Sequence, residues 1–358
     1  MIKVLVVEDS LVAQKFLVHV LSSDPKIQVV GTVSDGVDAV AAVRRTNPDV
    51  ITMDIHMPRM NGYEATRAIM QMVPTPIVIV SASTGVVDAT SSFRALDAGA
   101  LAAVLRPRGI GNPHHAGDVQ DLLRTIKAMS EVRVVRRFNR GQRNEEANVA
   151  LASPSRAANG RTPGHIEIVV IGASTGGPPV LSRILSRMPP GLAAPILIVQ
   201  HIAPGFGQGF VRWLNTVSCL PVHSGEHAQI AMPGHVYVAP DGVHMGVTHS
   251  RRILISDQPP DYGLRPSAAH LFRSVGQRMA PHALGILLTG MGKDGSAELA
   301  DLRARGGQTV AQDEASSVVH GMPGEAIRLG GANFILDPES IADKIIELVG
   351  EEKENPRG

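Results

Sequence analysis

The sequence has only one cysteine, no excess of either charge and no long apolar run. The lone Cys219 excludes a disulfide framework and a cysteine metal cluster, and it favours a reducing compartment. Because 34 Lys and Arg residues face 33 Asp and Glu residues, the charge offers no case for binding nucleic acid or an anionic membrane. No apolar segment reaches the roughly 18 residues of a membrane span. We therefore expect a cytoplasmic protein without membrane insertion, in which Cys219 is a small buried residue.

A length of 358 residues predicts two domains, since one domain usually holds about 100–200 residues. Short apolar runs alternate with amphipathic segments in residues 1–132 and again in residues 165–350. Between them the periodicity lapses, and residues 133–164 are rich in Arg, Ser, Pro, Asn and Gly, which predicts a flexible linker. Residues 351–358 form a polar tail.

The first domain is predicted to be a five-stranded, doubly wound α/β sheet of the flavodoxin-like type. We expect its strands at residues 3–7, 29–33, 50–53, 77–81 and 102–105. We expect its helices at residues 10–22, 36–46, 61–70, 86–98 and 118–132.

Acidic side chains follow two of these strands. Glu8 and Asp9 come after the first strand, Asp54 comes after the third, and the hydroxyl of Ser81 ends the fourth. Since ligands of such sheets bind beyond the carboxyl ends of the strands, these groups should converge there, where carboxylates repel one another unless a cation such as Mg²⁺ joins them. The alternative is that Asp9-Ser10 is merely a helix N-cap and Asp54 a turn residue.

These segments resemble the receiver domain of two-component response regulators. The likeness rests on residues 6–10 (Val-Val-Glu-Asp-Ser), 53–62 (Met-Asp-Ile-His-Met-Pro-Arg-Met-Asn-Gly) and 80–82 (Val-Ser-Ala). The resemblance implies that Asp54 accepts a phosphoryl group from a sensor histidine kinase. It also implies that Asp9 and Asp54, with Glu8 nearby, hold Mg²⁺, and that Ser81 contacts the phosphoryl oxygens.

Two residues depart from the receiver pattern. Arg106 precedes Pro107 where receivers carry a lysine, and Ala103 stands where they often carry an aromatic switch residue. Arginine is a planar fork with a different reach from the compact lysine ammonium. How the phosphorylation of Asp54 is coupled to the second domain is therefore open at this point.

The second domain is predicted to be another doubly wound α/β unit, with a mainly parallel sheet and a short stretch of hairpins. We expect strands at residues 168–171, 196–200, 236–239, 244–247, 252–256, 284–289, 309–311 and 334–336. We expect helices at residues 180–188, 206–215, 268–279, 296–305, 322–329 and 338–349.

A lone serine lies where the first of these strands gives way to a helix. Residues 172–176 read Gly-Ala-Ser-Thr-Gly, a G-x-S-x-G pattern that holds Ser174 exposed on a tight turn. The free N–H groups of the following helix could stabilise an oxyanion there. The same turn could equally cradle a phosphate, so the turn alone leaves a serine nucleophile and an anion site open.

A serine nucleophile needs a base and a group that orients the base. His201 directly follows the apolar strand 196–200, and Asp294 lies in a Gly-rich turn after another strand. Both therefore fall at strand ends, as Ser174 does. The alternatives are that His201 is a structural residue and that Asp294 caps the helix beginning at Ser296.

Four segments of this domain resemble the catalytic domain of the chemotaxis protein-glutamate methylesterases, namely residues 171–178, 199–202, 238–244 and 288–295. The order of receiver, linker and this domain also matches that family. The resemblance implies that Ser174 is the nucleophile, His201 the general base and Asp294 its orienting group. It implies hydrolysis of glutamyl methyl esters on the cytoplasmic helices of methylated chemoreceptors, with release of methanol, and deamidation of receptor glutamines.

Beyond the resemblance, we hypothesise that Thr175 and the main chain around Met291 contact the transition state. We expect no cofactor for the esterase reaction and take a monomer as the default. The resemblance also implies that the receiver acts as a lid over Ser174 until Asp54 is phosphorylated. The alternative is a receiver-controlled binding or adaptor module without esterase activity.

Overall fold

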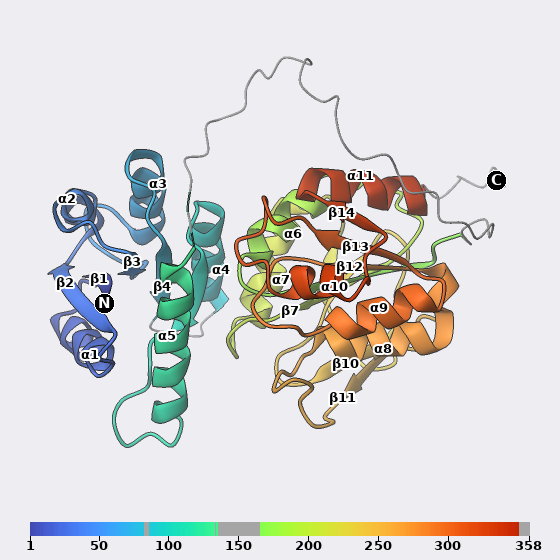
Figure 1. The fold of residues 1–358 in the computed structure, drawn as a ribbon, viewed down its shortest axis with the longest axis horizontal. Helices are drawn as coiled ribbons and strands as arrows, with labels where there is room; N and C mark the ends of the chain where they lie inside the picture. The colour runs from blue at the N-terminus through green and yellow to red at the C-terminus, as the bar shows by residue number, and fades with distance from the viewer. Residues whose placement is uncertain (82–85, 133, 135–164, 351–358) are drawn as a thin grey trace, which may run out of the picture.

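Figure 1 shows two α/β domains in the computed structural model, which describes residues 1–81, 86–132, 134 and 165–350. Each domain has a parallel sheet, so the predicted fold class is confirmed. The expected linker 133–164 lies outside the described residues except for Val134, and so does the tail 351–358.

The first domain is a five-stranded parallel sheet with the strand order β2-β1-β3-β4-β5. Strands and helices alternate along the chain as β1 (Ile2–Val7), α1 (Leu11–Ser22), β2 (Ile27–Val33), α2 (Gly36–Thr46), β3 (Val50–Met53), α3 (Gly62–Met72), β4 (Ile77–Ser81), α4 (Val86–Asp97), β5 (Ala102–Leu105) and α5 (His115–Ser130).

Both faces of this sheet are buried, which explains its near-continuous apolar strands. Successive residues of β1 enter different cores: Leu5 and Val7 pack on one face, and Val4 and Val6 on the other. This alternation follows from the two-residue repeat of a strand.

Helix α5 begins three residues before the predicted start at Asp118. Asp118 lies in the first turn, where its carboxylate accepts two hydrogen bonds from the Arg108 guanidinium, at 2.7 and 2.9 Å, and the helix begins without a side-chain cap.

The second domain has a seven-stranded parallel sheet, in the order β14-β13-β12-β6-β7-β9-β8, and a separate antiparallel ribbon of β10 and β11. Its elements are β6 (Ile168–Ala173), α6 (Gly177–Leu185), β7 (Ile196–Gln200), α7 (Gly207–Val217), β8 (Val222–Ser224), β9 (Val236–Val238), β10 (His244–Val247), β11 (Ile253–Ser256), α8 (Ala268–Met279), η1 (Ala280–His282), β12 (Ala283–Leu287), α9 (Ser296–Ala304), β13 (Gln308–Gln312), α10 (Met322–Arg328), β14 (Phe334–Leu336) and α11 (Pro338–Val349).

Several predictions for this domain were wrong. Strand β8 was not predicted; it is an edge strand of three residues that include the polar His223 and Ser224. Helix α6 lies three residues earlier at both ends than predicted, and β12 ends two residues before its predicted end. Cys219 was expected to be buried, whereas the side chain is exposed and its thiol donates to the Ser186 carbonyl at 3.2 Å. The neighbouring Leu220, only 2 % exposed, takes the buried position of that turn instead.

The domains meet where α4 packs against α6 and α7, as Figure 1 shows. Phe93 of α4 inserts among three aromatic rings of the second domain. Its ring centroid lies 6.2 Å from that of Phe206, 5.0 Å from that of Phe210 and 5.5 Å from that of Trp213. All four side chains are almost fully buried, so one apolar core runs through both domains.

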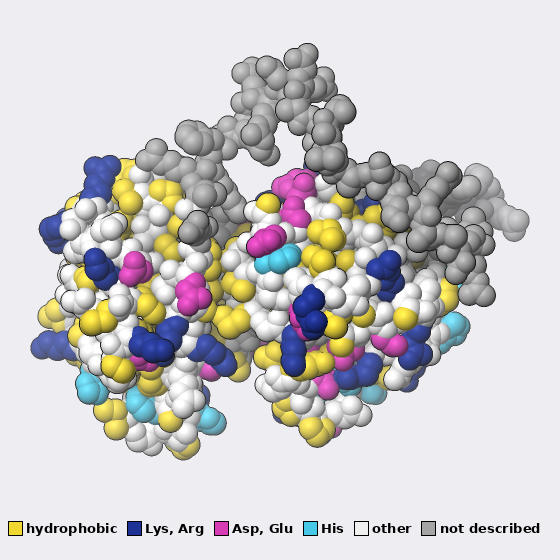
Figure 2. All heavy atoms as spheres, in the orientation of Figure 1, with side chains coloured by type: hydrophobic (Ala, Val, Ile, Leu, Met, Phe, Trp, Pro, Cys, Tyr) yellow, Lys and Arg dark blue, Asp and Glu magenta, His cyan; other side chains and the backbone are white. Residues whose placement is uncertain are grey.

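Cationic and anionic side chains are interspersed over both domains on the face drawn in Figure 2. This mixture agrees with the balanced charge of the sequence. Within the described ranges, no helix combines the length and apolar character needed to cross a membrane.

The aromatic contact can be tested because Trp213 is the single tryptophan of the chain. Replacing Phe93 by Ala should weaken the contact between the domains, since loss of a buried phenyl ring typically costs about 3–5 kcal/mol. We expect a red shift of the tryptophan emission as Trp213 gains solvent. The matched variant Phe16→Ala, on α1 against His115, should leave the emission unchanged. An unshifted spectrum for Phe93→Ala would contradict the contact.

Candidate active site

Ser174 lies directly after β6, a strand that is buried along its whole length. Its N–H donates to the Thr289 carbonyl at 3.0 Å, and its carbonyl accepts the Gly177 N–H at 2.8 Å. Two prolines in the first turn of α6 suit the start of a helix because they need no backbone donor there. The backbone of Ser174 is therefore fixed on both sides.

The turn around Ser174 is too crowded for side chains on its glycine neighbours. Gly176 has a φ of 80°, a left-handed conformation that favours glycine. A Cβ on Gly290 would lie 2.6 Å from the Ser174 Cβ, so the turn after β12 packs directly against the serine.

His201 follows β7, the strand that pairs with β6. Its Nε2 lies 2.8 Å from Oδ2 of Asp294, and its side chain is 10 % exposed. Because an ionised carboxylate only accepts, Nε2 carries the proton in this pair, and Nδ1 of the neutral ring is free to accept another.

Asp294 is 1 % exposed and is held by donors on two sides. Besides His201 it accepts from the Ser267 hydroxyl at 2.6 Å and from the N–H groups of Ala268 and Ala269 at 2.7 and 3.1 Å. Burial raises the pKa of Asp294, but the hydrogen bonds from His201, Ser267 and Ala269 outweigh it and hold the pKa below its ordinary value. The group is therefore an anion at neutral pH.

These contacts show that Asp294 does not cap α9, the helix that begins at Ser296. Helix α9 begins after Gly295 without a side-chain cap. The carboxylate instead accepts the first two N–H groups of α8, a helix that begins 26 residues earlier in the chain. It is thus a cap, but of another helix.

Thr175 follows Ser174, and Met291 follows Gly290 in the turn that packs against the serine. The Met291 side chain is 39 % exposed. In the described part of the chain, neither backbone N–H donates to a protein carbonyl. Among the same residues, no hydrogen bond joins the Ser174 hydroxyl to His201. The arrangement can present two N–H groups to an oxyanion beside the serine.

The first domain brings its predicted acidic residues together. Carboxylate oxygens of Glu8, Asp9 and Asp54 lie within 4.8 Å of one another. Asp9 is exposed, while Glu8 and Asp54 are 2 % and 8 % exposed. Three oxygen donors of this kind fit a hard divalent cation such as Mg²⁺. Ser10, by contrast, caps α1, as the structural alternative expected.

Burial of this cluster opposes the ionised forms of two of its carboxylates. Burial, together with the Asp54 carboxylate, raises the pKa of Glu8 to about 7. Burial also raises the pKa of Asp54, although the Ile55 N–H opposes the shift. A bound cation would reverse both effects by favouring the ionised carboxylates.

Arg106 and Ser81 border the same cluster. The Arg106 guanidinium lies 3.6 Å from Glu8 Oε2, so it reaches the acidic site despite replacing lysine. Ser81 is buried at the end of β4, and its carbonyl accepts the Arg106 N–H at 2.8 Å. Ala103 lies within β5 and packs against the core on the face towards α4.

A second group of possible ligands, His244, Asp261 and His270, does not fit a metal. The two imidazole rings stack with centroids 4.4 Å apart and planes 14° from parallel. A metal binds an imidazole nitrogen in the plane of its ring, so two stacked rings cannot share one ion. Arg273 moreover forms an ion pair with Asp261.

Comparison with known proteins assigns both domains. Residues 169–345 match the CheB methylesterase family, and residues 4–112 match the response regulator receiver domain. A protein-glutamate methylesterase/protein-glutamine glutaminase of Nitrosospira multiformis is 49 % identical over 360 residues, covering all of both chains. A relative of the same description from Geobacter metallireducens is 48 % identical and covers 98 % of this chain and 100 % of its own.

This chain belongs to the CheB methylesterase family. The crystal structure of the Thermotoga maritima CheB methylesterase catalytic domain agrees, with 34 % identity and a TM-score of 0.50 over 51 % of this chain and 99 % of that domain. Both resemblances noted in the sequence are therefore confirmed. The family assignment also makes the chain an enzyme with a receiver domain.

Three further residues build the site and were not predicted from the sequence: Gln200, Ser267 and Thr289. Ser267 precedes an apolar run and has the signature of a helix cap, yet its contact with Asp294 joins residues 27 positions apart. Thr289 was assigned to the end of a strand. Its N–H donates to the Gln312 side-chain oxygen at 2.8 Å and not to the backbone of a neighbouring strand. This explains why β12 ends at Leu287.

The raised pKa of Glu8 predicts a pH dependence of stability. Between the ordinary value of 4.5 and about 7, the folded receiver keeps a proton that the unfolded chain loses. Without divalent cations, its free energy of unfolding should therefore fall by about 2–3 kcal/mol as pH rises through this window. Urea unfolding at several pH values measures this.

In Glu8→Gln the part of the slope due to Glu8 should disappear. Glu131→Gln, an exposed residue after α5, should keep the slope of the unaltered protein. Equal slopes in all three proteins would refute the role of Glu8.

Proposed function

We propose that this protein hydrolyses glutamyl methyl esters of methylated chemoreceptors and deamidates receptor glutamines, with Ser174 as the nucleophile. The observation that carries the proposal is the His201–Asp294 hydrogen bond of 2.8 Å, which lies on the strand end next to Ser174. The relatives named above are described as enzymes of both activities.

The reaction is an acyl transfer in two stages. His201 Nδ1 takes the Ser174 proton as Oγ bonds to the ester or amide carbonyl carbon. The imidazolium then gives that proton to the leaving group, which departs as methanol or ammonia. Water attacks the acyl-serine by the same route and releases the receptor glutamate. Asp294 keeps its negative charge throughout and stabilises the imidazolium.

The N–H groups of Thr175 and Met291 stabilise the oxyanion of each tetrahedral intermediate in this proposal. The positions of the two residues support this role. Thr175 follows the nucleophile, and Met291 follows Gly290, which lies against Ser174. Removing one such donor typically slows an enzyme about 100- to 1000-fold. The reaction needs no cofactor, and the proposal treats the enzyme as a cytoplasmic monomer.

The receiver controls access to Ser174 in this proposal. Asp54 accepts a phosphoryl group from a histidine kinase, and Asp9, Asp54 and Glu8 hold Mg²⁺, which when bound offsets the negative charge of the phosphoryl oxygens. Ser81 and Arg106 face the same group. Phosphorylation then favours an arrangement in which the two domains are less tightly packed.

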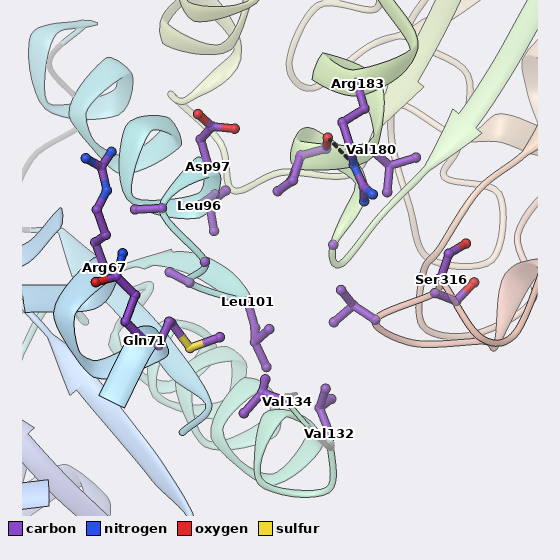
Figure 3. A pocket seen from close by; sticks show the side chains of 18 residues that line it. Arg67, Gln71, Leu96, Asp97, Leu101, Val132, Val134, Val180, Arg183 and Ser316 are labelled. Atoms are coloured by element: carbon purple, nitrogen blue, oxygen red, sulfur yellow. Dashed lines mark hydrogen bonds between the residues drawn. The ribbon is translucent and has the colours of Figure 1, made fainter. Parts of the chain in front are cut away.

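A cavity lined by residues of both domains supports the proposal that the receiver acts as a lid. Its volume is about 270 Å³, and Figure 3 shows Leu101 and Val132 of the receiver across it from Val180 and Ser316. Gly176, two residues after Ser174, also lines the cavity. The receiver thus lies beside the turn that carries the nucleophile.

The esterase proposal predicts that Ser174→Ala abolishes methanol release from methylated receptor membranes, because no other hydroxyl replaces the nucleophile. The control Ser186→Ala removes a hydroxyl at the far end of α6 and should keep full activity. Circular dichroism should show both variants folded. Undiminished turnover by folded Ser174→Ala would overturn the assignment, and an inactive unaltered protein would favour an adaptor.

The lid proposal predicts that a small phosphodonor with Mg²⁺ raises methanol release by the unaltered protein but not by Asp54→Ala. Phe93→Ala should raise the rate without phosphodonor, because it weakens the contact that holds the receiver in place. Phe16→Ala again serves as the control. A Phe93→Ala rate equal to that of the unaltered protein would count against the lid.

A further inference from the structure

Gln200, the last residue of β7, joins the backbones of the proposed nucleophile and base. Its side chain is 3 % exposed. Its amide nitrogen donates to the Ser174 carbonyl at 2.8 Å and to the His201 carbonyl at 2.9 Å. One carboxamide group therefore holds both residues between which the proton must pass.

The side chain continues the sheet beyond its last backbone contact. Ala173 and Gln200 are the final paired residues of β6 and β7, and the His201 N–H donates to the Ala173 carbonyl at 2.9 Å. Beyond this point the strands separate into two turns. The Gln200 amide supplies the next connection between them, at the residues that carry the chemistry.

The oxygen of the Gln200 carboxamide indicates that this residue serves through its N–H donors and not through its buried bulk. Gln200 Oε1 is buried and has no hydrogen-bond partner among the described residues. A buried carbonyl oxygen without a partner opposes folding, and an apolar side chain of the same shape would avoid that penalty. The two N–H donors are the property that such a side chain could not supply.

Gly177 makes room for this carboxamide. A Cβ at Gly177 would lie 2.1 Å from Gln200 Oε1 and 2.9 Å from the Ala173 Cβ. Gly177 is absent from the glycines with positive φ, so the close approach, and not backbone conformation, requires glycine there. The second glycine of the Gly176-Gly177 pair thus serves the placement of Gln200.

We propose that Gln200 is a positioning residue, which sets the separation of Ser174 Oγ from His201 Nδ1 by fixing the carbonyls of both residues. It does not touch the substrate. The inference rests on the proposed esterase function. Loss of the amide donors should therefore slow the chemical step while leaving substrate binding intact.

The test compares Gln200→Met with Asn215→Leu in the full-length protein. Both changes replace an amide by an apolar side chain of similar shape, and both remove two donors to backbone carbonyls. Asn215 donates to Val211 and Val222, at 3.3 and 2.6 Å, away from the site. Ester turnover gives kcat and KM, and the rate of inactivation by a fluorophosphonate reports the reactivity of Ser174.

For Gln200→Met we expect kcat and the inactivation rate to fall together by about 10- to 100-fold, with KM changed less than twofold. Asn215→Leu should match the unaltered protein in both rates. If Gln200→Met fails to fold, Gln200→Leu, which is uncharged and also lacks both amide donors, should show the same loss.

The inference is overturned if folded Gln200 variants keep kcat within twofold, or if Asn215→Leu loses as much activity as they do. A loss confined to KM would also overturn it. These outcomes differ from failure of the esterase proposal, in which the unaltered protein itself neither turns over ester nor reacts with the fluorophosphonate.

Discussion

The buried carboxylate of Asp294 is the interaction on which the esterase site depends. Burying an anion opposes folding by several kcal/mol unless donors surround it. Here those donors are the His201 ring, the Ser267 hydroxyl and two N–H groups at the start of α8. The helix end favours negative charge, so one group both anchors α8 and fixes the orientation of His201. Both the folding of α8 and the proposed catalysis therefore require Asp294 to be ionised and held in this position.

The receiver is joined to this site through apolar packing. Phe93 completes an aromatic cluster whose other members, Phe206, Phe210 and Trp213, belong to the second domain. The same apolar core continues beneath α6, the helix that begins three residues after Ser174. Helix α4 and the helix that follows the nucleophile thus share one apolar core. The acidic cluster around Asp54 lies at the ends of the receiver strands.

Much of this was predictable from local sequence. Apolar runs located most strands, and the turn chemistry of residues 172–178 located the serine, because strands, turns and helix starts depend mainly on neighbouring residues. The errors arose where distant residues compete. Asp118 was expected to begin a helix but binds Arg108, and Cys219 was expected in the core but is exposed and donates to the Ser186 carbonyl.

By itself, the sequence determined the two α/β domains, the acids at the receiver strand ends and the three strand-end residues Ser174, His201 and Asp294. Only the tertiary structure decided that Asp294 caps α8, that Gln200 bridges the carbonyls of Ser174 and His201, and that Phe93 enters the second domain. The physical reason is that each of these contacts joins segments far apart in the chain. Their partners are chosen by how the sheets and helices pack, and no local pattern records that choice.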